Sequence, residues 1–97
     1  MSKYKIIWSD KSFYDLEDTY GISAKESVET VESIINRADQ LIEFPKSGAR
    51  EPRLYDKLKE YRYLVEGNHK IIYRIEGLKV LIVRIFDTRQ SPDKMRL

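Results

Sequence analysis

The chain has 97 residues, with 18 Lys and Arg, 16 Asp and Glu, one His and no Cys. This length suits one compact core, so we expect a single domain over residues 1–97. The absence of Cys excludes disulfide bonds, thiolate metal sites and thiol nucleophiles, and it is typical of a reducing compartment, so we expect a cytoplasmic protein.

Charge is distributed unevenly along the chain. Residues 1–45 hold five Lys and Arg against nine Asp and Glu, a net charge of −4, whereas residues 46–97 hold 13 against seven, a net charge of +6. This asymmetry favours a basic surface in the second half that attracts phosphates or an acidic partner, although ordinary surface charge is an alternative. We expect no signal peptide in residues 1–8 and no membrane span, since the longest apolar run, residues 80–83, is too short.

The first part of the chain predicts a strand and a helix. Residues 3–8 are mostly β-branched and aromatic, which favours a strand, and Ser9 and Asp10 can accept hydrogen bonds from the free amides of a helix start. Apolar side chains then recur at i, i+3 and i+7, which predicts a helix over about residues 10–20. Its apolar face is expected to hold Phe13, Leu16 and Tyr20.

A second, longer helix is predicted after Gly21. Ser23-Ala24-Lys25-Glu26 reads as a capping box, in which the serine and glutamate side chains bind each other's backbone amides. The apolar stripe that follows is formed by Val28, Val31, Ile34, Ile35, Ala38, Leu41 and Ile42. Pro45 and Gly48 end the helix. Because the link between the two helices is short, they must form a hairpin.

The rest of the chain predicts a loop and a three-stranded meander. Residues 46–59 are polar and basic and are assigned to a loop with at most one turn. Strand-like runs follow at residues 61–65, 69–75 and 80–86, and Gly67-Asn68 and Glu76-Gly77 supply tight turns between them. The expected fold is therefore α+β, of order β-α-α-β-β-β, with the N-terminal helical hairpin on one face of a small, mainly antiparallel sheet.

Strand alternation predicts two sheet faces of different character. The face expected to cover the helices holds Tyr61, Tyr63, Val65, Ile71, Tyr73, Ile75, Leu81, Val83 and Ile85. The opposite face is expected to hold Arg62, Leu64, Lys70, Ile72, Arg74, Ile82, Arg84 and Phe86. This second set is too apolar for a solvated face and too charged for a core, which indicates a surface that binds a partner.

Six segments, in this order and spacing, resemble the RelE/ParE toxin superfamily across nearly the whole chain. They are YKIIWS (residues 4–9), DLE (15–17), IEFPKSG (42–48), RYLVEG (62–67), HKIIYR (69–74) and RIFDTRQSP (84–92). The resemblance implies a toxin made beside an antitoxin, whose extended or helical segment wraps and neutralises it. It also implies one of two activities, since RelE-like members cleave messenger RNA in the ribosome and ParE-like members poison DNA gyrase.

The nuclease alternative requires a proton acceptor, cations around the phosphate and a proton donor. By the resemblance, Lys70 and Arg89 stand where RelE-like toxins carry arginines, and Arg62 and His69 complete the candidate catalytic set. Two features weaken this alternative. Lys70 lacks the planar fork of arginine, and the tail, residues 90–97, holds no Tyr or His. His69 is alternatively a partly buried strand-edge residue, because alternation places it opposite Lys70.

Binding is therefore the first hypothesis: a ParE-like toxin that contacts gyrase through its basic sheet face and residues 87–97. The candidate nucleic-acid or partner-binding residues are Arg62, Lys70, Arg74, Arg84 and Arg89. A metal-independent, ribosome-dependent endoribonuclease and a non-toxic antitoxin-binding module are the alternatives. No cofactor and no metal are expected, because one His and four Gly supply neither a phosphate loop nor a metal-ligand set. The expected partners are a cognate antitoxin and either gyrase or the ribosome with its mRNA.

Overall fold

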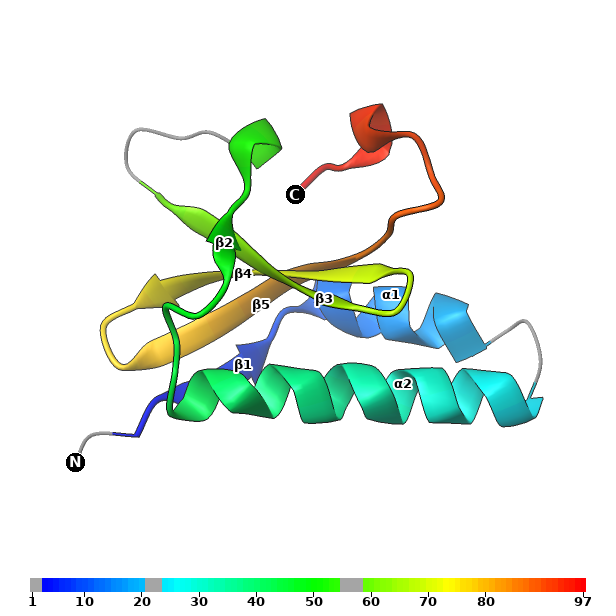
Figure 1. The fold of residues 1–97 in the computed structure, drawn as a ribbon, viewed down its shortest axis with the longest axis horizontal. Coiled ribbons are helices and arrows are strands. Elements are labelled where there is room, and N and C mark those ends of the chain that lie inside the picture. Colours follow the sequence, from blue (N-terminus) through cyan, green and yellow to red (C-terminus); the bar gives the residue numbers. More distant parts are fainter. Residues whose placement is uncertain (1–2, 21–23, 55–58) are drawn as a thin grey trace.

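The computed structural model describes residues 3–20, 24–54 and 59–97. Two helices cover one face of a five-stranded sheet, and two short segments rise from its other face (Figure 1). The helices are α1 (Asp10–Tyr20) and α2 (Ala24–Asp39), with short 3-10 turns η1 (Gln40–Ile42), η2 (Pro52–Leu54) and η3 (Pro92–Lys94). The strands are β1 (Lys5–Trp8), β2 (Ala49–Arg50), β3 (Tyr61–Glu66), β4 (His69–Glu76) and β5 (Lys79–Asp87).

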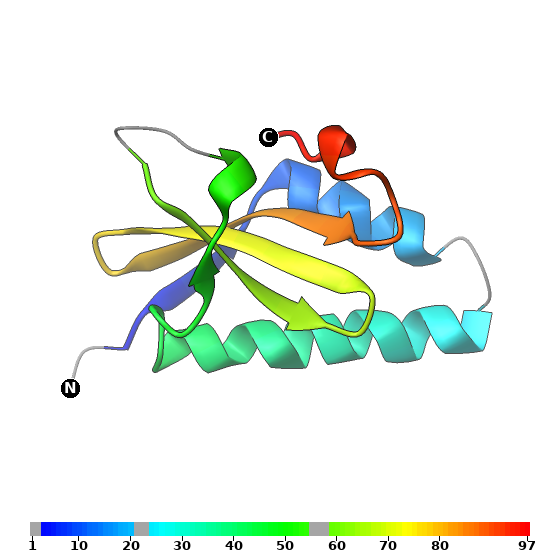
Figure 2. The same ribbon diagram turned by 45° about the horizontal axis from the view of Figure 1, so that its top comes forward.

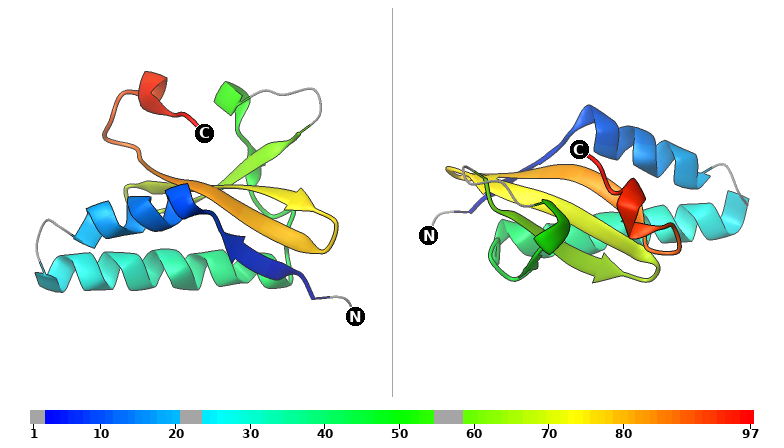
Figure 3. Two further views of the ribbon diagram at one scale, coloured as in Figure 1. Left: turned by 180° about the vertical axis from the view of Figure 1, so that it is seen from behind. Right: turned by 90° about the horizontal axis from the view of Figure 1, so that it is seen from above.

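The sheet confirms the predicted α+β class and the antiparallel meander. Its strand order is β1-β5-β4-β3-β2, and only the β1–β5 pair is parallel. The two helices lie side by side on one face, as Figure 3 shows from behind and from above. The loop predicted at residues 46–59 also contains β2, a two-residue strand that pairs with β3, so the prediction missed one edge strand. The predicted capping serine, Ser23, lies outside the described residues.

Two tight turns set the register of the meander. Glu66 pairs with His69 across Gly67-Asn68, and Glu76 pairs with Lys79 across Gly77-Leu78. Gly67 and Gly77 have positive φ angles of 56° and 60°, a conformation that costs little only for glycine at the first position of such turns. A β-bulge in β5 then shifts the β4–β5 register between Ile72 and Tyr73. These features decide which side chains face the helices.

The predicted sheet faces were partly wrong. The helix-facing core from the sheet holds Leu64, Ile71, Tyr73, Val80, Ile82 and Ile85, with Ile75 partly buried against it. On β3 the faces are reversed, because Leu64 pairs with Ile71 and therefore points toward the helices, while Tyr61 and Tyr63 point away. On β5, Val83 also lies on the helix-free face, and Ile82 lies on the helix side.

The helices contribute a narrower apolar surface than the periodicity predicted. Leu16 of α1 is buried, but Phe13 is 55% exposed, and the small side chain of Ser12 is buried in its place. On α2 and η1 the buried positions are Val31, Ile34, Ala38 and Leu41, whereas Ile35 is exposed. The buried face of α1 therefore includes polar side chains, and these contact the edge of β5.

The helix-free face carries a second, smaller apolar cluster. Tyr61, Ile72 and Met95 are buried there, and Leu54, Tyr63, Val83 and Phe86 pack against them. Figure 2 shows that η2 and the C-terminal tail lie above this face from opposite sides. The tail thus places Met95 over the sheet. The apolar side chains of the face that was predicted to bind a partner are therefore largely covered by the chain's own segments.

Candidate functional site

Lys70 and Arg74 lie on the helix-free face, as predicted, and both form ion pairs within the chain. Lys70 Nζ lies 2.9 Å from Glu51 Oε2 and 4.2 Å from the centroid of the Tyr63 ring. The Glu51 side chain is only 1% exposed, so Lys70 is the cation that compensates its charge. Arg74 pairs with Glu76 two residues along the same strand. The two cations therefore present little unbalanced positive charge.

Arg62 does not join them, which corrects the predicted grouping. It pairs with Tyr73 across β3 and β4, so it lies on the side of the sheet that faces the helices. Its guanidinium donates to the backbone oxygens of Gly48 at 2.8 Å and Lys46 at 3.3 Å, and it also pairs with Glu60. These contacts hold the segment before β2 against β3. These contacts give Arg62 a structural role.

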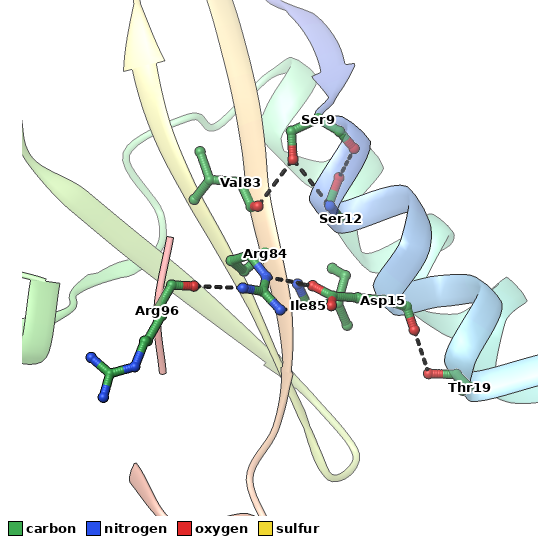
Figure 4. A network of polar contacts seen from close by, with 8 residues as sticks. All are labelled: Ser9, Ser12, Asp15, Thr19, Val83, Arg84, Ile85 and Arg96. Atoms are coloured by element: carbon green, nitrogen blue, oxygen red, sulfur yellow. Dashed lines mark hydrogen bonds and ion pairs between the residues drawn. The ribbon is translucent and has the colours of Figure 1, made fainter. Parts of the chain in front are cut away.

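Arg84 is held in a polar network at the margin of the sheet (Figure 4). Its Nε and Nη2 donate to the two carboxylate oxygens of Asp15 at 2.8 and 2.9 Å, and its Nη1 donates to the Arg96 carbonyl at 2.7 Å. Hydrogen bonding to Asp15 raises the pKa of the Arg84 guanidinium. Asp15 also accepts from the Ile85 amide at 2.8 Å. Arg84 therefore connects α1 to the C-terminal tail.

The same network closes the part of β5 that extends past β1. The Ser9 hydroxyl donates to the Val83 carbonyl at 3.0 Å, and Asp15 takes the Ile85 amide. Side chains of α1 therefore satisfy backbone groups that a neighbouring strand would otherwise satisfy. The start of α1 is held by the Ser12 amide, which donates to Ser9 Oγ at 3.1 Å.

His69 and Arg89 come together on the helix side of the sheet, around Asp87. Arg89 donates through Nε and Nη2 to Asp87 at 3.0 and 2.7 Å, and these bonds hold the pKa of Asp87 at about 2. His69 pairs with Asp87 across β4 and β5 and is 8% exposed. Burial lowers the pKa of His69 below its ordinary value of 6.5, although Asp87 acts in the opposite direction. The imidazole is therefore mainly neutral at pH 7.

The four residues of the predicted nuclease set do not meet in one place. Lys70 lies on the helix-free face, His69 and Arg89 lie on the other side, and Arg62 contacts the segment before β2. Within the described part of the chain, no group of three His, Asp or Glu side chains could hold a metal ion. None of the helices in that part is long and apolar enough to cross a bilayer.

Sequence reasoning missed the carboxylates that pair with the predicted cations. Asp87 and Arg89 are two residues apart in a turn, and this spacing is a signal that could have been used. Glu51 and Asp15 are 19 and 69 residues from their partners, so only the folded arrangement reveals those pairs. Each of the five predicted binding cations is therefore already paired with a carboxylate.

The model of a known protein family matches most of this chain. The model described as ParE toxin of type II toxin-antitoxin system, parDE, matches residues 6–92. The chain belongs to the ParE toxin family. A comparison with proteins of curated function gives no significant match.

Solved structures with a similar fold include chains of two toxin-antitoxin systems. A chain of the chromosomal ParDE toxin-antitoxin system from P. aeruginosa is similar, with a TM-score of 0.69 and 20% identity, over 88% of this chain and 96% of that one. A chain of the toxin-antitoxin complex RelBE2 from Mycobacterium tuberculosis is also similar, with a TM-score of 0.54 and 20% identity, over 86% and 95%. At this identity the likeness shows the RelE/ParE fold alone.

Proposed function

We propose that this ParE family toxin acts by binding and poisoning DNA gyrase rather than by cutting RNA, and that a cognate antitoxin neutralises it. The observation that carries the proposal is the separation of His69 from Lys70, which point to opposite faces of β4. General acid-base catalysis needs its groups within hydrogen-bond reach of one reacting site. Binding has no such requirement, and the family match favours the ParE-like activity.

A supercoiling assay tests this proposal. Purified toxin is titrated into gyrase, relaxed plasmid and ATP, and we expect loss of supercoiling at micromolar toxin. The same titration with the toxin premixed with its antitoxin is the control, and it should leave supercoiling intact. Full gyrase activity at micromolar free toxin would contradict the proposal.

A ribosome-dependent endoribonuclease is the second candidate, and one observation favours it. A neutral, buried His69 lies beside Asp87 and Arg89, so a proton acceptor stands next to a cation. Toeprinting on translating ribosomes distinguishes the two activities. Cleavage that disappears in His69→Gln or Lys70→Ala toxin would support the nuclease, whereas unchanged mRNA supports the binding activity.

The antitoxin proposal has support in the apolar side chains that the fold leaves open. Phe13, Tyr14, Phe44, Val65 and Leu78 are between 48% and 63% exposed. Phe13 and Tyr14 are adjacent on α1, and an exposed apolar patch there favours association with a partner. We expect the isolated toxin to aggregate more readily than the complex, as measured by light scattering. A non-toxic, antitoxin-binding module would instead be harmless when expressed alone, so growth arrest on induction would exclude it.

A further inference from the structure

Met95 anchors the C-terminal tail to the helix-free face of the sheet, above which the tail lies in Figure 2. Every other residue after β5 is exposed, whereas Met95 is only 8% exposed. Its side chain packs against Tyr61 and Ile72 of the sheet, and Leu54 of η2 packs against the same cluster. The apolar contacts that hold the tail in place are therefore concentrated in one side chain.

The other attachments of the tail are weak. Arg84 Nη1 donates to the Arg96 carbonyl at 2.7 Å, in a hydrogen bond that is open to solvent. Arg53 Nη1 of η2 lies 3.7 Å from Asp93 Oδ1, and these side chains are 52% and 89% exposed, so water and salt screen the pair. A segment with few buried contacts opens locally while the rest of the fold stays intact. Loss of the Met95 contacts would therefore release the tail without unfolding the sheet.

The anchoring side chain is also a redox-reactive one. The chain holds two Met and no Cys, and Met1 lies outside the described residues. A peroxide oxidises a Met thioether to the sulfoxide, a polar group that disrupts apolar packing. The sulfur lone pair attacks one peroxide oxygen, so an S–O bond forms as the O–O bond breaks. The sulfur gives two electrons to the peroxide, and the departing oxygen takes the remaining proton and leaves as water when the oxidant is hydrogen peroxide.

We propose that Met95 is an oxidation-sensitive latch, whose sulfoxide leaves the sheet and frees the tail. The cluster around Met95 is mainly aromatic and aliphatic, so burial of a sulfoxide oxygen there costs free energy that a solvated sulfoxide avoids. Release uncovers Ile72, which is fully buried in the closed state, and Tyr61, which is 7% exposed. Oxidation thus converts a covered sheet face into an open apolar one. This role is additional to gyrase or antitoxin binding and depends on neither.

Treatment of the purified toxin with hydrogen peroxide tests the latch. Mass spectrometry of the C-terminal peptides identifies the Met95 sulfoxide, and tryptic cleavage after the exposed Lys94 reports release of the tail. We expect the oxidised protein to be cleaved there at least about tenfold faster than the untreated protein. The fluorescence of anilinonaphthalene sulfonate should rise as the sheet face opens, whereas far-UV circular dichroism should stay unchanged. Methionine sulfoxide reductase should reverse both changes.

Two substitutions of Met95 supply the matched controls. Met95→Leu conserves the volume and apolar character of the side chain but cannot be oxidised, so the tail should stay closed with and without peroxide. This variant retains Met1, which makes it a control for oxidation elsewhere in the chain. Met95→Gln places a polar side chain in the cluster and should open the tail without peroxide. Synthetic peptides of residues 88–97, with Met95 oxidised or reduced, should be cleaved at equal rates, which excludes a preference of trypsin itself.

Several results would overturn the latch. Met95 would not be a latch if its sulfoxide formed only when the whole protein unfolds, or if the oxidised protein kept the cleavage rate and dye binding of the untreated one. An equal response of Met95→Leu to peroxide would assign the effect to another residue. Loss of the whole circular dichroism signal on oxidation would show a core contact instead of a detachable tail. The latch and the gyrase proposal fail separately, since none of these measurements involves gyrase.

Discussion

Replacement of Asp15 by alanine should destabilise the fold strongly, because its carboxylate joins α1 to β5 through three hydrogen bonds. Asp15 accepts from Arg84 Nε and Nη2 and from the Ile85 amide, all within 2.9 Å. The Asp15 side chain is 14% exposed and that of Arg84 is 29% exposed, so water replaces the lost partner only in part. A buried amide without a partner costs about 1–3 kcal/mol, and a hydrogen bond to a charged group contributes about 1.5–3 kcal/mol.

After a discount for the partial exposure of Arg84, we expect Asp15→Ala to lower the free energy of unfolding by about 2–4 kcal/mol. For a domain of this size, each kcal/mol shifts the melting temperature by about 4–8 °C. Urea denaturation followed by circular dichroism measures the effect, and a double-mutant cycle with Arg84→Ala isolates the pair. Asp18→Ala, one turn along α1 and without an ion pair to a described residue, should change stability by less than about 0.5 kcal/mol. An Asp15→Ala protein as stable as the wild type would refute the role assigned to the network in Figure 4.

Three further predictions concern the rest of the fold and its titrating groups. Gly48→Ala should lower the free energy of unfolding by about 1–3 kcal/mol in urea denaturation, because its Cβ would lie 2.5 Å from Tyr73 Oη; an equally stable variant would show that the segment before β2 gives way easily. The free energy of unfolding of the wild type should fall as pH drops below 6.5, because folding disfavours protonated His69. His69→Gln should remove this part of the pH dependence when unfolding is measured at several pH values, and identical pH profiles of the two proteins would contradict the prediction. NMR titration should find the pKa of Asp87 near 2, so the stability that Asp87 contributes is present above pH 3.8 and is lost as pH falls toward 2. Arg89→Ala should return this pKa toward 3.8, and an Asp87 that titrates normally in the wild type would rule the ion pair out.

The regular elements were predictable from local pattern. The helix at Asp10–Tyr20 and the three long strands follow from helical spacing, two-residue alternation and glycine turns, and the structure has them within one or two residues of the prediction. Short β2 was not predictable, since two residues carry no period. It exists because Ala49 and Arg50 meet β3 after the backbone has folded back.

The faces of β3 were predicted wrongly because the turn between β3 and β4 was not used to set the pairing of the two strands. A two-residue turn at Gly67-Asn68 requires Val65 to pair with Lys70 and therefore Leu64 to share a face with Ile71. Applying this register would have placed the aromatic side chains of β3 away from the helices. The bulge in β5 has no comparable signal, because it depends on the packing of residues on both strands.

The candidate site was predictable in residue type but not in electrostatic state. The cations were identified from the sequence, yet their charge is balanced by carboxylates far along the chain, such as Glu51 for Lys70. The hollow beside His69 and Asp87 is lined by four separate segments, so no stretch of sequence shows it. Long-range pairing decides both features, and only the fold supplies it.

The state of the DNA in cells arrested by this toxin tests the central claim most directly. If the toxin poisons gyrase, genomic DNA isolated soon after induction will carry breaks covalently attached to gyrase, and co-expression of the antitoxin will remove them. Arrested cells whose DNA stays intact while their mRNA is cut within translated codons would contradict a toxin that acts by binding gyrase.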